Sequence, residues 1–174
     1  MQLLIKAYVL TYAKLPVIYS YVQNKTLEVD PEPTYNTHCK RHIIKKKRRS
    51  NMKYDVTITG LGPMALEFLS PGMEMQFVIL FNEDAPAELA ELAILHTKGE
   101  LTEAPVPGDT MKIGGKTYKI TAVGDEAVHT LRELGHCTLA FSASEEAYRP
   151  GCIMLDGEII TAEDVANGAV VQIF

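Results

Sequence analysis

The chain has 174 residues, of which 47% are hydrophobic, and with five phenylalanines and no tryptophan its core is predicted to be mainly aliphatic. This length accommodates one domain with an extension, or two very small domains. The net charge of −5 is unevenly spread: residues 1–52 hold 10 Lys/Arg against 3 Asp/Glu, a balance of +7, and residues 53–174 hold 7 against 19, a balance of −12. The acidic part argues against nucleic acid as a partner, because nothing in it would neutralise phosphates.

Residues 1–52 are predicted to be an N-terminal extension, either disordered or not translated. The segment Leu3–Tyr21 is apolar but broken by charges and a proline, so it offers neither a membrane-spanning run of about 20 residues nor the pattern of a signal peptide. The basic run 45–49 is typical of a disordered tail, with binding to RNA or an anionic membrane as the alternative.

A start at Met52 would explain the change in composition. Arg48-Arg49 can be encoded by AGG-AGA, which resembles a bacterial ribosome-binding site placed two codons before Met52. We therefore expect translation to begin at Met52.

From Lys53 onward the pattern is that of short strands joined by glycine turns. Alternation predicts a strand over Tyr54–Thr59, and an apolar run predicts another over Met73–Phe81. Hairpins are predicted over Met111–Ile120, turning at Gly114-Gly115, and over Met154–Ile160, turning at Asp156-Gly157. A last strand is predicted over Ala169–Phe174, and such edge strands could pair between chains to give a homodimer.

Two helices interrupt these strands. Asp84 is predicted to cap a helix over Ala87–Leu95, whose Leu89, Leu92 and Ala93 share one face. A second helix is predicted over Glu126–Leu134, closed by Gly135 and preceded by a strand that begins at Ile120. The fold class is therefore mainly β, a small partly open β-barrel or sandwich with one or two short helices.

Two histidines lie where a predicted element meets a turn, the usual place for side chains that act on a ligand. His96 ends the apolar run before Gly99, and His136 follows Gly135 at the start of a strand. Two imidazoles on a small scaffold suit phosphoryl chemistry or metal binding. A third histidine, His129, is interpreted as an ordinary helix residue.

The three cysteines, Cys39, Cys137 and Cys152, are too few and too irregular for a disulfide framework. They are interpreted as reduced thiols of an intracellular protein, with Cys137 and Cys152 buried.

Several segments, in this order, resemble the glucitol/sorbitol-specific IIA component of the bacterial phosphoenolpyruvate-dependent sugar phosphotransferase system. The resemblance covers about residues 53–174, the length of that family's domain. It is carried by Ala85-Pro-Ala-Glu-Leu, Ile94-Leu-His96, Gly99-Glu-Leu101, Pro107-Gly108, Ala122-Val-Gly124, Leu131-Arg-Glu-Leu-Gly-His136 and Thr138-Leu139.

This resemblance implies a cytoplasmic phosphoryl carrier that associates transiently with the membrane transporter. It would accept a phosphoryl group from the histidine-containing phosphocarrier protein and pass it to the IIB unit, beside IIC, with no cofactor or metal. By the resemblance, the matching acceptor is His96. The chemistry is consistent with this role, since a neutral imidazole offers a lone pair and forms a labile phosphoramidate.

The phosphoryl oxygens also need donors. His136 and the backbone N–H groups of Gly99 or Gly135 are the candidates for this role. Some relatives carry a second histidine two residues after the acceptor; here that residue is Lys98, whose ammonium could contact phosphate.

Two alternatives stay open. One is a non-catalytic metal- or ligand-binding β-barrel using His96, His129 and His136, although zinc would want three or four ligands in tight geometry. The other is a regulatory module that keeps the IIA fold without transfer.

Overall fold

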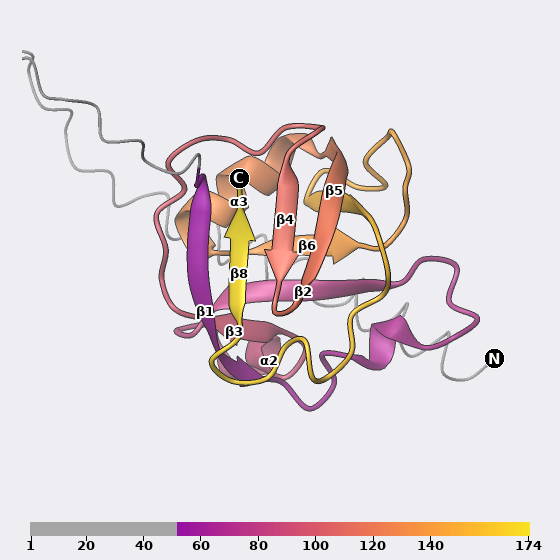
Figure 1. Cartoon of the computed structure of the whole chain (residues 1–174). Coiled ribbons are helices and arrows are strands. Elements are labelled where there is room, and N and C mark those ends of the chain that lie inside the picture. Colours follow the sequence, from indigo (N-terminus) through magenta and orange to yellow (C-terminus); the bar gives the residue numbers. More distant parts are fainter. Residues whose placement is uncertain (1–51) are drawn as a thin grey trace, which may run out of the picture. The chain divides into compact units, whose positions relative to one another are not determined.

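Strands close into a barrel in the computed structural model, which describes residues 52–174 (Figure 1). Their order around the barrel is β1-β3-β2-β6-β7-β5-β4-β8, and the ring is closed. The mainly β class is confirmed, and the barrel has no open side. The strands are β1 (Tyr54–Leu61), β2 (Phe77–Asn82), β3 (Ile94–His96), β4 (Thr110–Ile113), β5 (Lys116–Val123), β6 (Cys137–Ala140), β7 (Cys152–Asp156) and β8 (Val170–Ile173).

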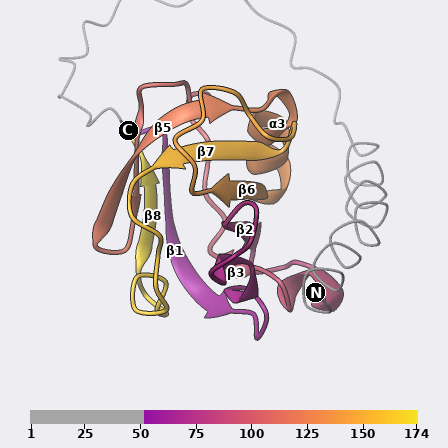
Figure 2. The same cartoon turned by 90° about the vertical axis from the view of Figure 1, so that its right-hand side faces the viewer.

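The strands form two groups that run in different directions. In Figure 1, β1, β8 and β4 stand upright in front of β2 and β6, which run across the view. Figure 2, turned by 90°, shows β6 and β7 on one side and β1 and β8 on the other. Most neighbours pair antiparallel, but β2 pairs parallel to β3, and β6 parallel to β7.

Alternating side chains fill the barrel. Along β1, Tyr54, Val56 and Ile58 are buried while the residues between them are more exposed. The same period of two recurs in β4, β5 and β8, as expected when one face of each strand meets the core and the other meets solvent.

Three helical segments connect the strands: the 3₁₀ turn η1 (Glu67–Leu69), α2 (Ala87–Ala90) and α3 (Asp125–Leu134). The predicted helix over Glu126–Leu134 is confirmed, with Asp125 as its first residue. Gly135 ends it in the left-handed conformation at φ +60°, which glycine adopts without steric penalty. The helix thus delivers Gly135 and His136 to the start of β6.

The predicted helix over Ala87–Leu95 is wrong in its extent. Only α2 is helical; its N-cap is Pro86, with no side-chain cap from Asp84. Ile94–His96 instead forms β3, because its backbone pairs with β1 on one side and β2 on the other. The helical spacing of Leu89, Leu92 and Ala93 reflects three residues buried around one short turn.

Other boundaries need correction. The strand predicted from Met73 begins at Phe77. The hairpin turning at Gly114-Gly115 is confirmed as β4 and β5. Asp156-Gly157 does not turn a hairpin, because β7 pairs with β5 and β6 and no strand follows until β8.

The last predicted strand is present as β8, but it is not an edge. It pairs with β1 on one side and β4 on the other. The backbone groups of this strand are therefore already used, and the argument for a homodimer through Ala169–Phe174 is lost.

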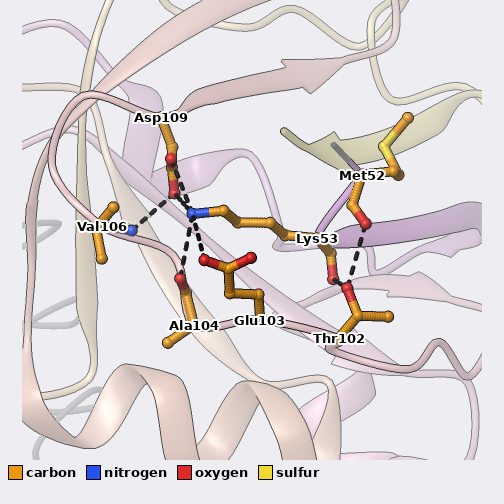
Figure 3. A network of polar contacts seen from close by, with 7 residues as sticks. All are labelled: Met52, Lys53, Thr102, Glu103, Ala104, Val106 and Asp109. Carbon is orange, nitrogen blue, oxygen red and sulfur yellow. Dashed lines mark hydrogen bonds and ion pairs between the residues drawn. The ribbon is translucent and has the colours of Figure 1, made fainter. Parts of the chain in front are cut away.

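A buried ion pair ties the start of β1 to the loop before β4 (Figure 3). The Lys53 ammonium lies 2.8 and 3.0 Å from the two Asp109 carboxylate oxygens and 3.4 Å from the Ala104 carbonyl oxygen. The exposed Glu103 carboxylate lies at 3.8 Å. Asp109 also accepts from the Val106 N–H at 2.8 Å, so this cluster is well paired.

The predictions about residues 1–51, including the disordered extension, the untranslated segment and Cys39, lie outside the described residues. Within the part of the chain that the structure describes, no helix is long and apolar enough to cross a membrane.

Candidate functional site

The ends of two parallel strands meet the end of α3 at one place on the barrel. His96 is the last residue of β3 and Asn82 the last of β2, and the two are partners in the parallel register. Partnered residues of a parallel pair point to the same face of a sheet. Gly135 and His136, between α3 and β6, lie against this position.

The His96 imidazole is fully buried and held at both nitrogens. Nδ1 lies 2.8 Å from the Thr97 carbonyl oxygen, and Nε2 lies 2.9 Å from the Gly135 carbonyl oxygen. The backbone is fixed too, because the His96 carbonyl accepts from the Glu83 N–H at 2.8 Å. The ring is therefore held between its own segment and the turn after α3, and the Glu83 N–H holds its backbone.

Both oxygens that face the ring can only accept, whereas a neutral imidazole carries one N–H. One of the two contacts is then a lone pair against a carbonyl oxygen unless the ring holds two protons. The Thr97 carbonyl belongs to the next residue, whose N–H is itself bonded to the Thr57 carbonyl at 2.9 Å. Gly135, by contrast, belongs to the left-handed turn after α3. The Nδ1 contact is thus the more firmly anchored one.

His136 follows Gly135, whose carbonyl faces the His96 ring, but its own ring is directed at β2. Its Nδ1–H donates to the Leu80 carbonyl at 3.1 Å, and its ring packs on Phe81 with centroids 4.6 Å apart. Burial lowers the pKa of His136 to about 4, although the bond to the Leu80 carbonyl opposes the shift. At neutral pH His136 is therefore uncharged, and its Nε2 carries a lone pair.

Gly135 is the point where the surrounding side chains converge. A Cβ at this residue would lie 2.2 Å from Asn82 Oδ1 and 2.6 Å from His96 Cε1. The predicted role of the Gly135 N–H toward phosphate is wrong, because that N–H donates to the Leu131 carbonyl at 3.1 Å and closes α3. Its carbonyl group, instead, faces His96.

Asn82 was not singled out from the sequence. It is 7% exposed, and its Oδ1 is buried without a hydrogen-bond partner among the described residues. The local signal is weak, since one asparagine after an apolar run is ordinary turn chemistry. Its place beside His96 follows from the pairing of β2 with β3, which no local pattern reveals.

The remaining predicted site residues are Lys98, Gly99 and His129. The Lys98 ammonium is exposed and pairs with the Asp84 carboxylate at 2.7 Å. Gly99 packs closely on β1, where a Cβ would lie 2.3 Å from Val56 Cγ1. His129 is half-buried in the middle of α3.

Cys137 and Cys152 are free and buried, as predicted. Burial raises the pKa of both thiols, so neither is a ready nucleophile. No group of three or more His, Cys, Asp or Glu side chains that could hold a metal occurs in residues 52–174.

The mainly β barrel is a fold that a solved structure shares. The fold is similar to the crystal structure of a PTS system IIA component from Enterococcus faecalis V583, with a TM-score of 0.51 and 24% sequence identity, covering 67% of this chain and 96% of that one. At this identity the likeness concerns the fold.

Sequence comparison identifies the family. The family model of the PTS system glucitol/sorbitol-specific IIA component matches residues 53–171. The glucitol/sorbitol-specific EIIA component of Escherichia coli (strain K12) is 41% identical over 119 residues, covering 68% of this chain and 92% of that protein. The protein of the same name from Shigella flexneri matches to the same extent. The chain belongs to the glucitol/sorbitol-specific IIA family of the phosphotransferase system, which confirms the resemblance found in the sequence.

Proposed function

We propose that His96 accepts a phosphoryl group from the histidine-containing phosphocarrier protein and passes it to the IIB unit of a glucitol/sorbitol transporter. Residues 53–174 form the carrier domain, acting in the cytoplasm beside the IIB and IIC units. The observation that carries the proposal is the held imidazole of His96: a ring oriented by carbonyl oxygens at the end of a short, doubly paired strand.

The contacts favour Nε2 as the attacking nitrogen. An Nδ1–H bond to a backbone carbonyl is a common way to fix the tautomer of a reactive imidazole. With the proton on Nδ1 and bonded to Thr97, the lone pair lies on Nε2. That lone pair faces the Gly135 carbonyl, so the turn after α3 must shift before phosphorus can approach.

The transfer needs no net proton movement on this domain. A bond forms between phosphorus and Nε2 while the bond from phosphorus to the donor histidine breaks, and its electron pair returns to the donor nitrogen. The Nδ1–H stays hydrogen-bonded to the Thr97 carbonyl oxygen throughout the transfer. Passing the group to the IIB unit reverses the roles.

The role of His136 at this site depends on which of its ring nitrogens carries a proton. In the neutral ring Nδ1–H is used by the Leu80 carbonyl, so Nε2 can accept but not donate. Stabilising phosphoryl oxygens would require a proton on Nε2. We therefore expect His136 to act mainly by packing the turn against β2.

The test is phosphorylation of the full chain by phosphoenolpyruvate, Enzyme I, the phosphocarrier protein and magnesium, which Enzyme I requires. The adduct should be acid-labile and base-stable, as expected of phosphohistidine, and should pass to added IIB. His96→Gln should abolish labelling, and the matched control His129→Gln should keep it. Undiminished labelling of His96→Gln would overturn the assignment and make His136 the first alternative acceptor.

A further inference from the structure

Asn82 has a side-chain amide whose oxygen is buried but makes no hydrogen bond among the described residues. Its backbone carbonyl accepts from the Ala85 N–H at 3.0 Å, so its main chain has a structural role. The residue is 7% exposed, and its Oδ1 is buried without a hydrogen-bond partner among the described residues. Buried amides are almost always paired in folded proteins, so an unpaired one calls for a specific explanation.

The side chain is directed into the space beside His96. Asn82 Oδ1 and His96 Cε1 both lie within 2.6 Å of the position that a Cβ of Gly135 would occupy. The same glycine places its carbonyl oxygen 2.9 Å from His96 Nε2. The amide, the imidazole and the glycine turn therefore share one small region, and glycine is the residue that leaves it open.

A phosphoryl group on Nε2 would bring negatively charged oxygens into this region. The Gly135 carbonyl oxygen would repel them, the His136 ring is neutral and bonded to β2, and the Lys98 ammonium is paired with Asp84. The Asn82 amide offers two N–H donors on its nitrogen. A half-turn of the amide exchanges its oxygen and nitrogen positions, and in this site the exchange breaks no hydrogen bond of Oδ1.

We propose that Asn82 is a catalytic residue of the transfer, whose side-chain N–H donates to an oxygen of the phosphoryl group as it bonds to His96 Nε2. This inference rests on the function proposed above. The end of β2 holds the amide beside His96 before the reaction begins, and a half-turn of the amide directs its N–H toward the developing charge. In the resting protein Oδ1 has no hydrogen-bond partner among the described residues, so the amide can turn its N–H toward the incoming phosphoryl group without losing a bond of Oδ1.

The experiment measures the initial rate of phosphoryl transfer to the full chain, with the thermal midpoint of each variant. Asn82→Asp keeps the shape but replaces both donors by acceptors, and Asn82→Ala removes the amide. Asn167→Asp, in the exposed loop before β8, is the matched control. We expect Asn82→Asp to slow transfer by about 10²–10³-fold, the range seen when one such donor is lost. Asn82→Ala should slow it by at least about tenfold, and the control should match the wild type.

Stability separates this role from a structural one. If the amide served the fold through a buried water, Asn82→Ala would lower the midpoint and leave the rate unchanged, and the proposal would be overturned. If Asn82→Asp fails to fold, the rate of Asn82→Ala decides, and a value within twofold of the wild type rejects the inference. A wild type that takes up no label, or a His96→Gln variant that does, would instead reject the proposed function.

Discussion

The two buried polar clusters of the barrel differ in how completely their atoms are paired. Around Lys53, an ammonium meets two carboxylate oxygens and a carbonyl oxygen, and the carboxylate meets a further N–H. Around His96, two carbonyl oxygens face one imidazole, and a neighbouring amide oxygen has no partner in residues 52–174. Both clusters lie in the same short domain, so its size does not explain the difference.

The comparison indicates what each cluster is for. A fully paired cluster gains its stabilisation on folding and has no capacity left for a ligand. An incompletely paired one reduces stability in the resting state, and such groups persist where a partner arrives during function. The Lys53 cluster is therefore expected to affect stability alone, and the His96 cluster to affect transfer.

Removing the Lys53 charge should give the largest loss of stability. Lys53→Met keeps the buried stem but leaves the Asp109 carboxylate, 14% exposed, with the Val106 N–H as the one contact that Figure 3 still draws to it. Because the pair is partly buried, removing its cation costs about 3 kcal/mol, the lower end of the range for buried pairs. Urea unfolding should show this loss, while the labelling rate of the folded protein stays at the wild-type value. A slowed rate would contradict the separation of the two clusters.

Acid should weaken the fold through His136. Its pKa is about 4 in the folded protein, below the ordinary value of about 6.5. The unfolded chain therefore takes up the proton first, so this part of the stability is complete above pH 6.5 and falls as the pH drops toward 4. The total loss is about 3 kcal/mol at 1.4 kcal/mol per pH unit.

Urea midpoints measured between pH 7 and 4 should consequently fall more steeply for the wild type than for His136→Gln. The labelling rate of the variant should stay within about tenfold of the wild type, since the neutral ring has no donor left for phosphate. A decrease of about 10²–10³-fold would show instead that His136 donates to the phosphoryl oxygens.

A side chain at Gly135 should affect both stability and transfer. Gly135→Ala meets the unfavourable φ of +60°, which costs a residue with a Cβ about 1–2 kcal/mol. It also forces Asn82 and His96 apart, because the new methyl group would lie 2.2 and 2.6 Å from their atoms. We expect labelling to fall by more than the loss of folded protein explains. Gly168→Ala, at φ +90° in open space, is the matched control for backbone strain.

Sequence reasoning found the parts of the site that local patterns encode. The glycine that ends α3 and the order of short segments around His96 were enough to place both histidines at turns. These local patterns did not reveal that His96 is fully buried, because its ring contacts Gly135, which lies 39 positions further along the chain. Asn82 was missed for the same reason, since its importance arises from the parallel register of β2 and β3.

The fold, like the site, was predictable only where local sequence patterns encode it. Alternation and glycine turns predicted β1, the β4–β5 hairpin and β8, whose apolar patterns or turn residues can be read from the local sequence. These local patterns failed where pairing with distant strands determines the structure. Ile94–His96 forms a strand because it pairs with both β1 and β2, and β7 pairs with β5 and β6. Closure of the barrel likewise joins β1 to β8 across the whole described chain.

The smallest effect is expected at the surface pair of Lys98 and Asp84. Their side chains are 63% and 42% exposed, so solvent screens the 2.7 Å contact and its contribution to stability is at most about 0.5 kcal/mol. Lys98→Met should therefore leave the urea midpoint nearly unchanged, which makes it the matched control for Lys53→Met.

The role in phosphate contact predicted for Lys98 gives a second readout, because the ammonium can leave Asp84 at little cost. If it does so, Lys98→Met should slow labelling several-fold at low salt and much less at 0.5 M salt, where charge is screened over about 4 Å. A rate equal to the wild type at both salt concentrations would rule out a phosphate contact by Lys98 and assign the stabilisation of phosphate to the buried groups.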